Sequence, residues 1–215
     1  MKVKILRQDA PFTEPYWESF SYDGPDDGTV ASLLDYLNYK DDIKNDKGED
    51  VPRIGWECSC LQGVCGGCAM VINEKPCLAC ETFVKDLGDE IRIRPLQKFM
   101  VIHDLVVDRT GIQERMIQGH AYKDGEVNPE SLAKYPERYA AARCLKCGLC
   151  LEVCPNYSKG EEFYGAAFLS DCYLIGSHGK EYDKHFAKGC SKSLSCMDVC
   201  PMKIPTISLM AKLNR

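Results

Sequence analysis

Eleven of the fourteen cysteines in this 215-residue chain lie in three groups with short, regular spacings. The first group is Cys60-x4-Cys65-x2-Cys68, followed by Cys80 after eleven intervening residues. The second is Cys144-x2-Cys147-x2-Cys150-x3-Cys154, and the third is Cys190-x5-Cys196-x3-Cys200. Closely spaced cysteines in a chain without a visible secretory signal favour metal binding over disulfides. The groups therefore predict three metal centres in a reducing compartment.

The first group has the plant-type spacing of a [2Fe–2S] site. Three of its thiolates come from one loop, and Gly63, Gly66 and Gly67 permit the positive backbone angles that a loop around a cluster requires. Their amides are expected to donate hydrogen bonds to the cluster sulfurs. The spacing predicts a [2Fe–2S] cluster on four thiolates, Cys60, Cys65, Cys68 and Cys80, with a zinc ion as the alternative.

The second and third groups share the run that bacterial two-cluster ferredoxins use, in which the last cysteine precedes a proline. Counted back from Cys200, the third group has Ser193 where the second cysteine of the run belongs. The fourth cysteine of each run ligates the other run's cluster. The spacing therefore predicts a [4Fe–4S] cluster on Cys144, Cys147, Cys150 and Cys200. The remaining thiolates form a three-membered set, Cys154, Cys190 and Cys196.

Ser193 decides the expected type of the third centre. Three thiolates with one iron corner missing are the ligand set of a [3Fe–4S] cluster, which is the predicted occupant. The alternative is that Ser193 ligates a fourth iron as an alkoxide, a harder and more basic donor than a thiolate. Cys58, Cys77 and Cys172 remain outside the groups, and Cys172 is expected to be a small buried hydrophobe in an apolar segment.

The elements around the cysteines predict an α+β chain of two domains. Residues 1–105 read as a β-grasp plant-type ferredoxin domain, with strands at 2–6, 17–22, 69–72 and 91–95 and a helix capped by Thr29. Residues 106–215 read as a helical, bacterial-ferredoxin-like two-cluster domain. Its expected helices are residues 112–118, 130–143, 163–175 and 205–213.

Composition excludes several functions. The net charge of −5, without a basic stripe, argues against a nucleic-acid partner. No apolar run approaches the roughly 20 residues that span a bilayer, so we expect a chain that is soluble by itself. The sequence has no paired carboxylates, P-loop or Gly-x-Gly-x-x-Gly motif. We therefore expect no catalytic residue and no substrate chemistry on this chain alone.

The combination of a plant-type group and a two-run bacterial group resembles the iron–sulfur subunits of succinate dehydrogenase and fumarate reductase. The similarity extends over roughly residues 1–213. Besides the cysteine runs, three segments match this family: Gly-Val-Cys-Gly-Gly-Cys at 63–68, Leu-Ala-Cys-Glu-Thr at 78–82 and Val-Ile-His-Asp-Leu-Val-Val-Asp at 101–108.

The resemblance implies a peripheral subunit of a hetero-oligomer on the cytoplasmic side of the cell membrane. A flavoprotein with covalent FAD, where succinate and fumarate interconvert, is the partner at the [2Fe–2S] domain. A membrane anchor that binds quinone is the partner at the [3Fe–4S] end. Electrons pass along FAD, [2Fe–2S], [4Fe–4S], [3Fe–4S] and quinone, or in reverse, within the respiratory chain or tricarboxylic acid cycle. The resemblance leaves open whether the anchor carries heme.

The residues after the first Cys-Pro bear on the quinone type. Ubiquinone-reducing relatives carry a tryptophan there, whereas this chain has Asn156-Tyr157-Ser158, which is similar to relatives that use menaquinone. An alternative also remains: the same motifs fit an iron–sulfur relay for a different flavoprotein reductase with a soluble electron donor.

Overall fold

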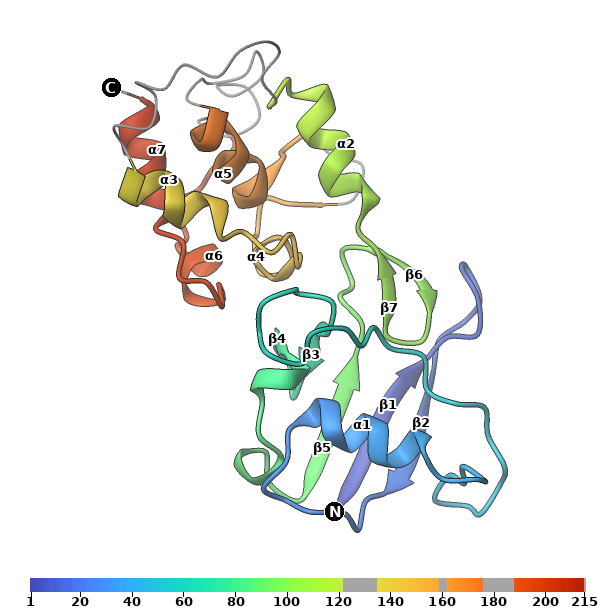
Figure 1. Ribbon diagram of the computed structural model, residues 1–215. Coiled ribbons are helices and arrows are strands. Elements are labelled where there is room, and N and C mark those ends of the chain that lie inside the picture. Colours follow the sequence, from blue (N-terminus) through green and yellow to red (C-terminus); the bar gives the residue numbers. More distant parts are fainter. Residues whose placement is uncertain (122–134, 159–161, 176–187, 215) are drawn as a thin grey trace. The chain divides into compact units, whose positions relative to one another are not determined.

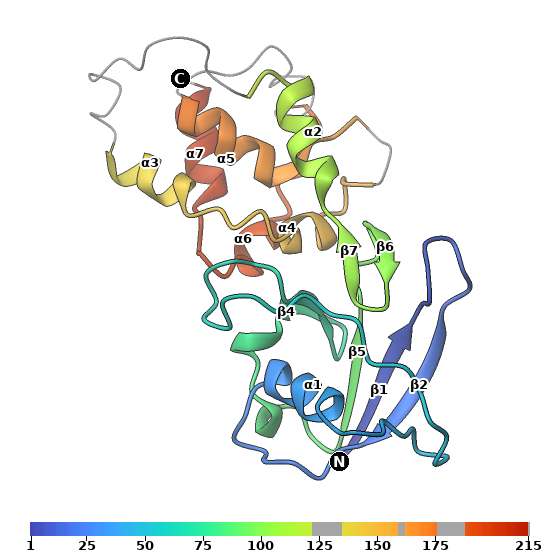
Figure 2. The ribbon, with the colours of Figure 1, turned by 45° about the vertical axis from the view of Figure 1, so that its right-hand side comes forward.

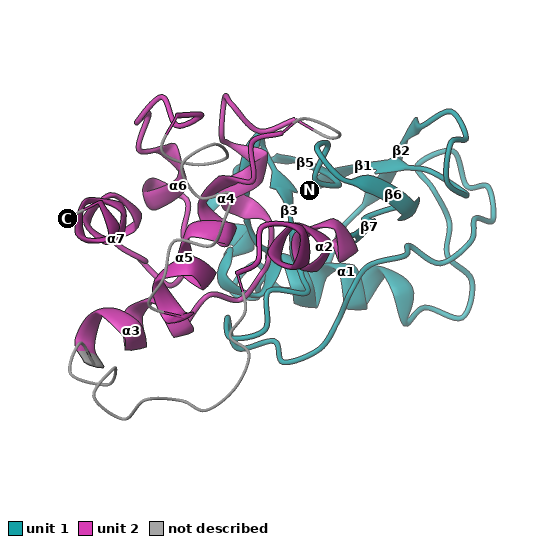
Figure 3. Ribbon diagram, turned by 90° about the horizontal axis from the view of Figure 1, so that it is seen from above, with its two compact units in different colours: residues 1–108 teal, residues 109–215 magenta. Residues whose placement is uncertain are grey.

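The computed structural model describes residues 1–121, 135–158, 162–175 and 188–214. It divides the chain into two compact units, Met1–Asp108 and Arg109–Arg215, coloured separately in Figure 3. A boundary at residue 105, as expected from the sequence, would separate two strands that pair with each other. These are β6 (Met100–His103) and β7 (Val106–Asp108), which the sequence analysis did not anticipate. The observed division therefore falls after β7.

Unit 1 is built on a five-stranded mixed sheet with the order β2-β1-β5-β3-β4. Its strands are β1 (Lys2–Arg7), β2 (Tyr16–Ser21), β3 (Ala69–Ile72), β4 (Lys75–Leu78) and β5 (Glu90–Arg94). Strand β1 runs parallel to β5, and the other pairings are antiparallel. Four of these strands confirm the sequence prediction. Strand β4 was not predicted from the sequence, and its Pro76 is tolerated because β4 is an edge strand.

Helix α1 (Val30–Asn38) lies across one face of this sheet (Figures 1 and 2). Thr29 caps it as predicted: Thr29 Oγ1 accepts a hydrogen bond from the Ser32 N–H at 3.3 Å, and Ser32 Oγ accepts one from the Thr29 N–H at 2.8 Å. The helix buries one apolar face, formed by Val30, Ala31, Leu33, Leu34 and Leu37. Two short 3-10 helices follow the sheet's β3–β4 hairpin, η1 (Ala79–Glu81) and η2 (Val84–Asp86).

Unit 2 is helical in its described parts. Its helices are α2 (Thr110–Gln118), α3 (Tyr135–Ala142), α4 (Leu149–Glu152), α5 (Gly165–Ile175), α6 (Ser195–Asp198) and α7 (Thr206–Leu213). Helix α5 is buried from Gly165 to Tyr173, and α2, α3, α4 and α7 pack against it. The helices expected at 112–118, 163–175 and 205–213 are confirmed. The one expected at 130–143 is seen from Tyr135, since residues 130–134 lie outside the described part. Across the described residues, no helix has the length and apolar character needed to cross a membrane.

Arg7 is a fully buried cation at the centre of a hydrogen-bond network in unit 1. Its Nε donates to Asp104 Oδ1 at 2.8 Å, and its Nη1 donates to Glu18 Oε2 at 2.7 Å. Its Nη2 donates to the carbonyl oxygens of Pro52 and Arg53. Burial lowers the pKa of Arg7, but the hydrogen bond and charge of Asp104 and the charge of Glu18 outweigh it and leave the pKa raised. The guanidinium therefore stays charged, and each of its three nitrogens donates to a hydrogen-bond acceptor.

Asp104, in the turn between β6 and β7, extends the same network through further hydrogen bonds. Its Oδ1 also accepts from the Gln8 N–H at 3.1 Å, and its Oδ2 accepts from the Gly55 N–H at 2.8 Å. His103 lies beside it, with Nε2 3.2 Å from Asp104 Oδ2. Asn38 adds a further tie, because its side chain bonds both the N–H and the C=O of Ile54. These contacts hold the segment that leads into the first cysteine group.

Replacing Arg7 with methionine is expected to destabilise unit 1 by about 3–5 kcal/mol, because a buried carboxylate at Asp104 loses its partner. Thermal unfolding of the full chain, followed by circular dichroism, measures this as a lower midpoint. Lys4→Met is the matched control on the same strand. It breaks an exposed ion pair with Glu90 at 3.1 Å and should leave the midpoint nearly unchanged. Equal midpoints for the two variants would contradict the central role of Arg7.

Candidate functional site

The loop from Cys60 to Cys68 has the backbone geometry that the first cysteine group requires. Gly63 and Gly66 have positive φ angles of 70° and 79°, in the region that disfavours residues with a Cβ. A Cβ at Gly63 would also lie 2.7 Å from Glu81 Oε1. Gly67 does not have a positive φ, so the expectation for that glycine was wrong. Its N–H instead donates to Cys65 Sγ at 3.5 Å.

The β3–β4 hairpin explains why the fourth cysteine follows so far behind the third. Its two turn residues, Asn73 and Glu74, both have positive φ, as a tight two-residue hairpin turn requires. Strand β4 runs antiparallel to β3 and leads directly into η1, which carries Cys80. The Sγ atoms of Cys68 and Cys80 thereby lie 3.3 Å apart, although eleven residues separate them in the chain.

The thiols of this group lie in contrasting surroundings. Backbone N–H groups, first that of Gln62, together with the Cys65 side chain lower the pKa of Cys60 to about 7. Burial raises the pKa of Cys68 to about 12. A buried thiol becomes a thiolate only when a cation compensates its charge, so metal binding here is coupled to proton release. Iron would supply that compensation, which fits the donor set of four sulfurs.

In unit 2 the second and third cysteine runs have the same local backbone, 46 positions apart (144 to 190). The run that begins at Cys144, called the first run below, leads into the one-turn helix α4. The run that begins at Cys190, called the second run, leads into the one-turn helix α6. Gly148 and Leu194, at the start of these helices, have φ angles of 88° and 64°. Lys146 and Lys192, two residues earlier, have φ angles of 54° and 57°. Left-handed backbone thus brackets the same position in both runs.

That bracketed position is Cys147 in the first run and Ser193 in the second. The correspondence rests on four matching left-handed residues and two matching helices, and not on spacing alone. A non-glycine residue in this conformation costs about 1–2 kcal/mol. The second run accepts that cost at Leu194, where the first run has Gly148. Ser193 therefore occupies the backbone position equivalent to that of Cys147.

One hollow in unit 2 brings together thiols from both runs. It measures about 450 Å³, including space open to solvent, and its thiols come from Cys144, Cys147, Cys150, Cys196 and Cys200. Burial raises the pKa of Cys147 to about 11 and that of Cys150 well above the ordinary thiol value. Ala166, Ala167 and Ser170 of α5 close another side. The side chains that α5 contributes to this wall are therefore small.

A second hollow collects the remaining thiols, Cys154, Cys190 and Cys196, and also Ser193. It measures about 350 Å³, again with solvent-open space included. The Sγ of Cys190 accepts a hydrogen bond from the Lys192 N–H at 3.4 Å. Asn156 also lines it, and its Oδ1 is buried with no hydrogen-bond partner among the described residues. Since an amide can present either its oxygen or its NH2 group, Asn156 suits an occupant with acceptor sulfurs.

The described cysteines do not converge as a site for one ion. No three His, Cys, Asp or Glu side chains of the described residues are placed to hold a single metal ion. None of the fourteen cysteines, all of which lie in the described ranges, is in a disulfide. Cys172 is fully buried in α5, as predicted, and burial raises its pKa to about 12. Cys58 is exposed, and Cys77 donates to the Lys75 carbonyl oxygen from β4.

Sequence reasoning missed two charged contacts near these hollows. Lys146 forms an ion pair with Asp171 of α5, whose side chain is only 5% exposed. Burial raises the pKa of Asp171, and the Lys146 charge opposes that shift. Arg109 Nε donates to the Cys147 carbonyl oxygen at 3.1 Å. Nothing in the cysteine spacing indicates these contacts, because α5 and α2 are brought in by tertiary packing.

The segment after Cys154 and Pro155 is held by Arg115 of α2. The Arg115 guanidinium lies over the ring of Tyr157, 4.4 Å from its centroid, and 5.6 Å from that of Tyr164. Its Nη1 donates to the Phe163 carbonyl oxygen at 2.8 Å. Tyr157 is buried, and burial raises its pKa. A stacked tyrosine therefore fills this position next to the second hollow.

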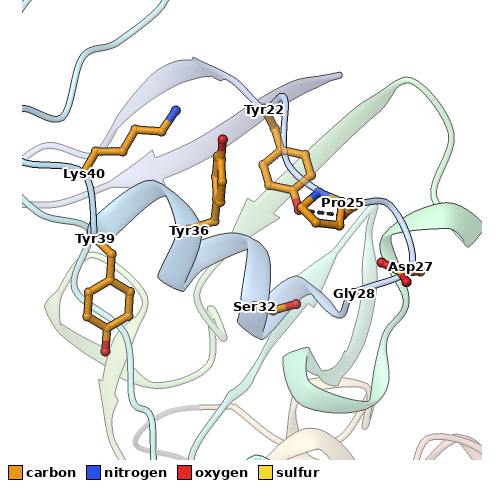
Figure 4. A pocket seen from close by; sticks show the side chains of 8 residues that line it. All are labelled: Tyr22, Pro25, Asp27, Gly28, Ser32, Tyr36, Tyr39 and Lys40. Carbon is orange, nitrogen blue, oxygen red and sulfur yellow. Dashed lines mark hydrogen bonds between the residues drawn. The ribbon is translucent and has the colours of Figure 1, made fainter.

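A third hollow, on unit 1, lacks thiols among its lining residues (Figure 4). It lies beside α1, where the rings of Tyr22 and Tyr36 meet edge to face and the Lys40 ammonium lies 4.7 Å from the Tyr36 ring centroid. Tyr22 Oη donates to the Pro25 carbonyl oxygen at 2.6 Å. Tyr36 Oη donates to Asp23 Oδ1 at 3.0 Å, so the hydroxyls of both tyrosines already have acceptors within unit 1.

Comparison with known proteins adds independent evidence. Residues 2–114 match the family model of a 2Fe-2S iron-sulfur cluster binding domain, and residues 140–204 match that of a 4Fe-4S dicluster domain. A chain in the solved structure of the Mycobacterium smegmatis Sdh1 complex in the apo form shares the fold. The two superpose with a TM-score of 0.78 at 20% identity, over 99% of this chain and 94% of that one.

Two relatives with named functions match along nearly their whole length. The succinate dehydrogenase iron-sulfur subunit of Bacillus subtilis is 32% identical over 98% of this chain and 90% of its own. The fumarate reductase iron-sulfur subunit of Wolinella succinogenes is 28% identical over 100% of this chain and 96% of its own. With a 2Fe-2S domain followed by a dicluster domain, the chain belongs to the family of succinate dehydrogenase and fumarate reductase iron–sulfur subunits, which are components of oxidoreductases.

Proposed function

We propose that this chain is the electron-transfer subunit of a succinate:quinone or fumarate:quinone oxidoreductase. It joins a flavoprotein with covalent FAD to a membrane anchor, in a hetero-oligomer on the cytoplasmic side of the cell membrane. Bound [2Fe–2S], [4Fe–4S] and [3Fe–4S] clusters pass single electrons between these partners in either direction. The chain contributes ligands, insulation and local charge, and no substrate chemistry. Family membership supports the relay role.

The observation that carries this proposal is the repeated backbone of the two runs in unit 2. It supports a ligand position at Ser193 equivalent to that of Cys147, where a hydroxyl replaces a thiol. A cluster with three thiolates and a missing iron corner fits this set, and Cys154, Cys190 and Cys196 are its proposed ligands. The proposed [4Fe–4S] ligands are Cys144, Cys147, Cys150 and Cys200.

In unit 1 the proposed [2Fe–2S] ligands are Cys60, Cys65, Cys68 and Cys80. The mixed sheet with one covering helix supports its assignment as a β-grasp ferredoxin domain. The paired short helices support a bacterial-ferredoxin-like unit 2. Menaquinone is the proposed quinone, because Asn156-Tyr157-Ser158 follows Cys154-Pro155 and Arg115 holds Tyr157 in place. Ubiquinone-type relatives have a tryptophan in this segment.

The overall proposal is tested by isolating the complex that contains the full chain from membranes. We expect a covalent-flavin subunit and a membrane subunit to copurify, and succinate oxidation to reduce a menaquinone analogue faster than a ubiquinone analogue. Activity with both analogues at equal rates would overturn the quinone assignment. Copurification with a flavoprotein but no membrane subunit would instead favour a relay with a soluble donor.

Electron paramagnetic resonance (EPR) tests the role of Ser193. An oxidised [3Fe–4S] cluster is paramagnetic, whereas oxidised [2Fe–2S] and [4Fe–4S] clusters are silent. We expect a near-stoichiometric signal from the gently oxidised wild type and its loss in Ser193→Cys, because the added thiolate completes a fourth iron corner. Quinone-linked turnover should slow as the site's potential falls.

Ser191→Cys is the matched control for that test. It adds the same thiol to the same loop, two positions away, and Ser191 also lines the second hollow. Its oxidised signal should remain. A signal that survives in Ser193→Cys, or that disappears equally in both variants, is incompatible with a specific ligand position at Ser193.

The crossed ligand assignment gives a separate expectation. Cys154→Ala should remove the oxidised [3Fe–4S] signal and keep the reduced [4Fe–4S] signal, although Cys154 belongs to the first run. Cys200→Ala should do the reverse. Cys172→Ala, also a buried thiol of unit 2, should leave both signals intact. The opposite pattern for Cys154 and Cys200 would show that each run serves only its own cluster.

A further inference from the structure

The two runs of unit 2 differ in the charge that surrounds one repeated lysine. Lys146 and Lys192 occupy equivalent positions, each immediately before the second ligand position and each in left-handed backbone. Lys146 lines the first hollow and Lys192 lines the second. Each lysine therefore lies at the wall of one proposed cluster site. The runs are alike in sequence here, so any difference comes from what packs around them.

Packing of α5 supplies a counter-charge for only one of these lysines. The Lys146 ammonium pairs with Asp171 Oδ1, and the side chains are 24% and 5% exposed. Asp171 Oδ2 is buried without a hydrogen-bond partner among the described residues. The carboxylate thus depends on Lys146, and its neighbour Ser170 lines the same hollow.

Lys192 lies in an exposed loop, and its ammonium has no carboxylate partner in the parts of the chain that the structure describes. Its backbone N–H donates to Cys190 Sγ at 3.4 Å, and no acidic side chain among the described residues pairs with its ammonium. Solvent and salt screen it only in part, because screening within one Debye length of about 10 Å is incomplete. The two centres therefore experience different local charge.

We propose that the buried Lys146–Asp171 pair, set against a Lys192 that no described carboxylate pairs with, lowers the reduction potential of the [4Fe–4S] centre relative to the third centre. Reduction adds one negative charge to a cluster. A nearby cation favours the reduced form, and a neutral ion pair gives less of that effect. The difference favours electron movement from the [4Fe–4S] centre to the third centre. This inference rests on the proposed function and assigns Lys146, Asp171 and Lys192 as potential-setting residues.

The test is an EPR-monitored redox titration of the complex containing the full chain. Asp171→Asn keeps the shape of the side chain and removes its charge, so the Lys146 cation is left uncompensated. We expect the reduced-to-oxidised ratio of the [4Fe–4S] centre at a fixed potential to rise about tenfold. That corresponds to a midpoint shift of about 59 mV upward for one electron. Arg109 is present in every variant, so its contribution cancels.

A double variant separates charge from structural support. In Lys146→Met/Asp171→Leu both charges are absent, and buried ion pairs replaced by apolar residues are often neutral for stability. Its [4Fe–4S] midpoint should return close to that of the wild type. Lys192→Met should lower the reduced-to-oxidised ratio of the third centre at a fixed potential about threefold. This change is smaller because Lys192 is exposed and its charge is screened. The midpoint potential of the [4Fe–4S] centre should not change in this variant.

Each outcome separates the inference from the proposal on which it rests. Absence of the [4Fe–4S] or [3Fe–4S] signal from the wild type would overturn the proposed function. Normal wild-type signals with an unshifted midpoint in Asp171→Asn would overturn only the inference, and so would a double variant shifted as far as Asp171→Asn. If the Asp171→Asn variant does not retain its [4Fe–4S] cluster, the Lys192→Met variant is the deciding test. An unchanged midpoint potential of its third centre overturns the inference, and a lowered midpoint potential supports it.

Discussion

The dicluster unit depends on left-handed backbone on either side of Cys147 and Ser193, the equivalent positions of its two cysteine runs. The residues before and after Cys147 and Ser193 turn the chain sharply, and Cys147 lines the first hollow while Ser193 lines the second. Glycine does this without strain at Gly148, while Leu194 adopts the same conformation at a cost. Because the two turns match, thiols from both runs can line the first hollow, and a serine hydroxyl takes one place beside the second. The two hollows thus share one repeated turn and differ in the side chain at its centre.

In each unit a buried ion pair joins segments that are distant in sequence. Arg7 and Asp104 connect β1 to the β6–β7 turn and to the backbone that precedes Cys60. Lys146 and Asp171 connect the first ligand loop to α5. Buried pairs are poor sources of net stability, because desolvation offsets much of their attraction, but losing one partner is costly. Their value here is positional: each fixes a cysteine loop against a sheet or helix that is distant in sequence.

The three thiol groups could be predicted from the sequence because their cysteines are separated by only a few residues. Alternating apolar residues likewise predicted β1, β2, β3 and β5, and the Thr29 cap predicted the start of α1. Strand β4 was missed because Pro76 weakens the strand pattern, although an edge position tolerates it. Strands β6 and β7 were missed because each is short and stable only through pairing with the other. Gly67 has ordinary backbone, since only two of the three glycines must turn the loop.

The sequence by itself determined the number of thiol groups, the serine in place of one cysteine, and the two-part organisation of the chain. These follow from residue identity and spacing along the backbone. Only the tertiary structure decided that Cys68 and Cys80 meet through a hairpin, that Asp171 reaches Lys146, and that Arg115 stacks on Tyr157. Such contacts join residues far apart in sequence, and burial gives them their strength. Spacing therefore predicted a set of candidate ligands, while packing set the electrostatic surroundings of those thiols.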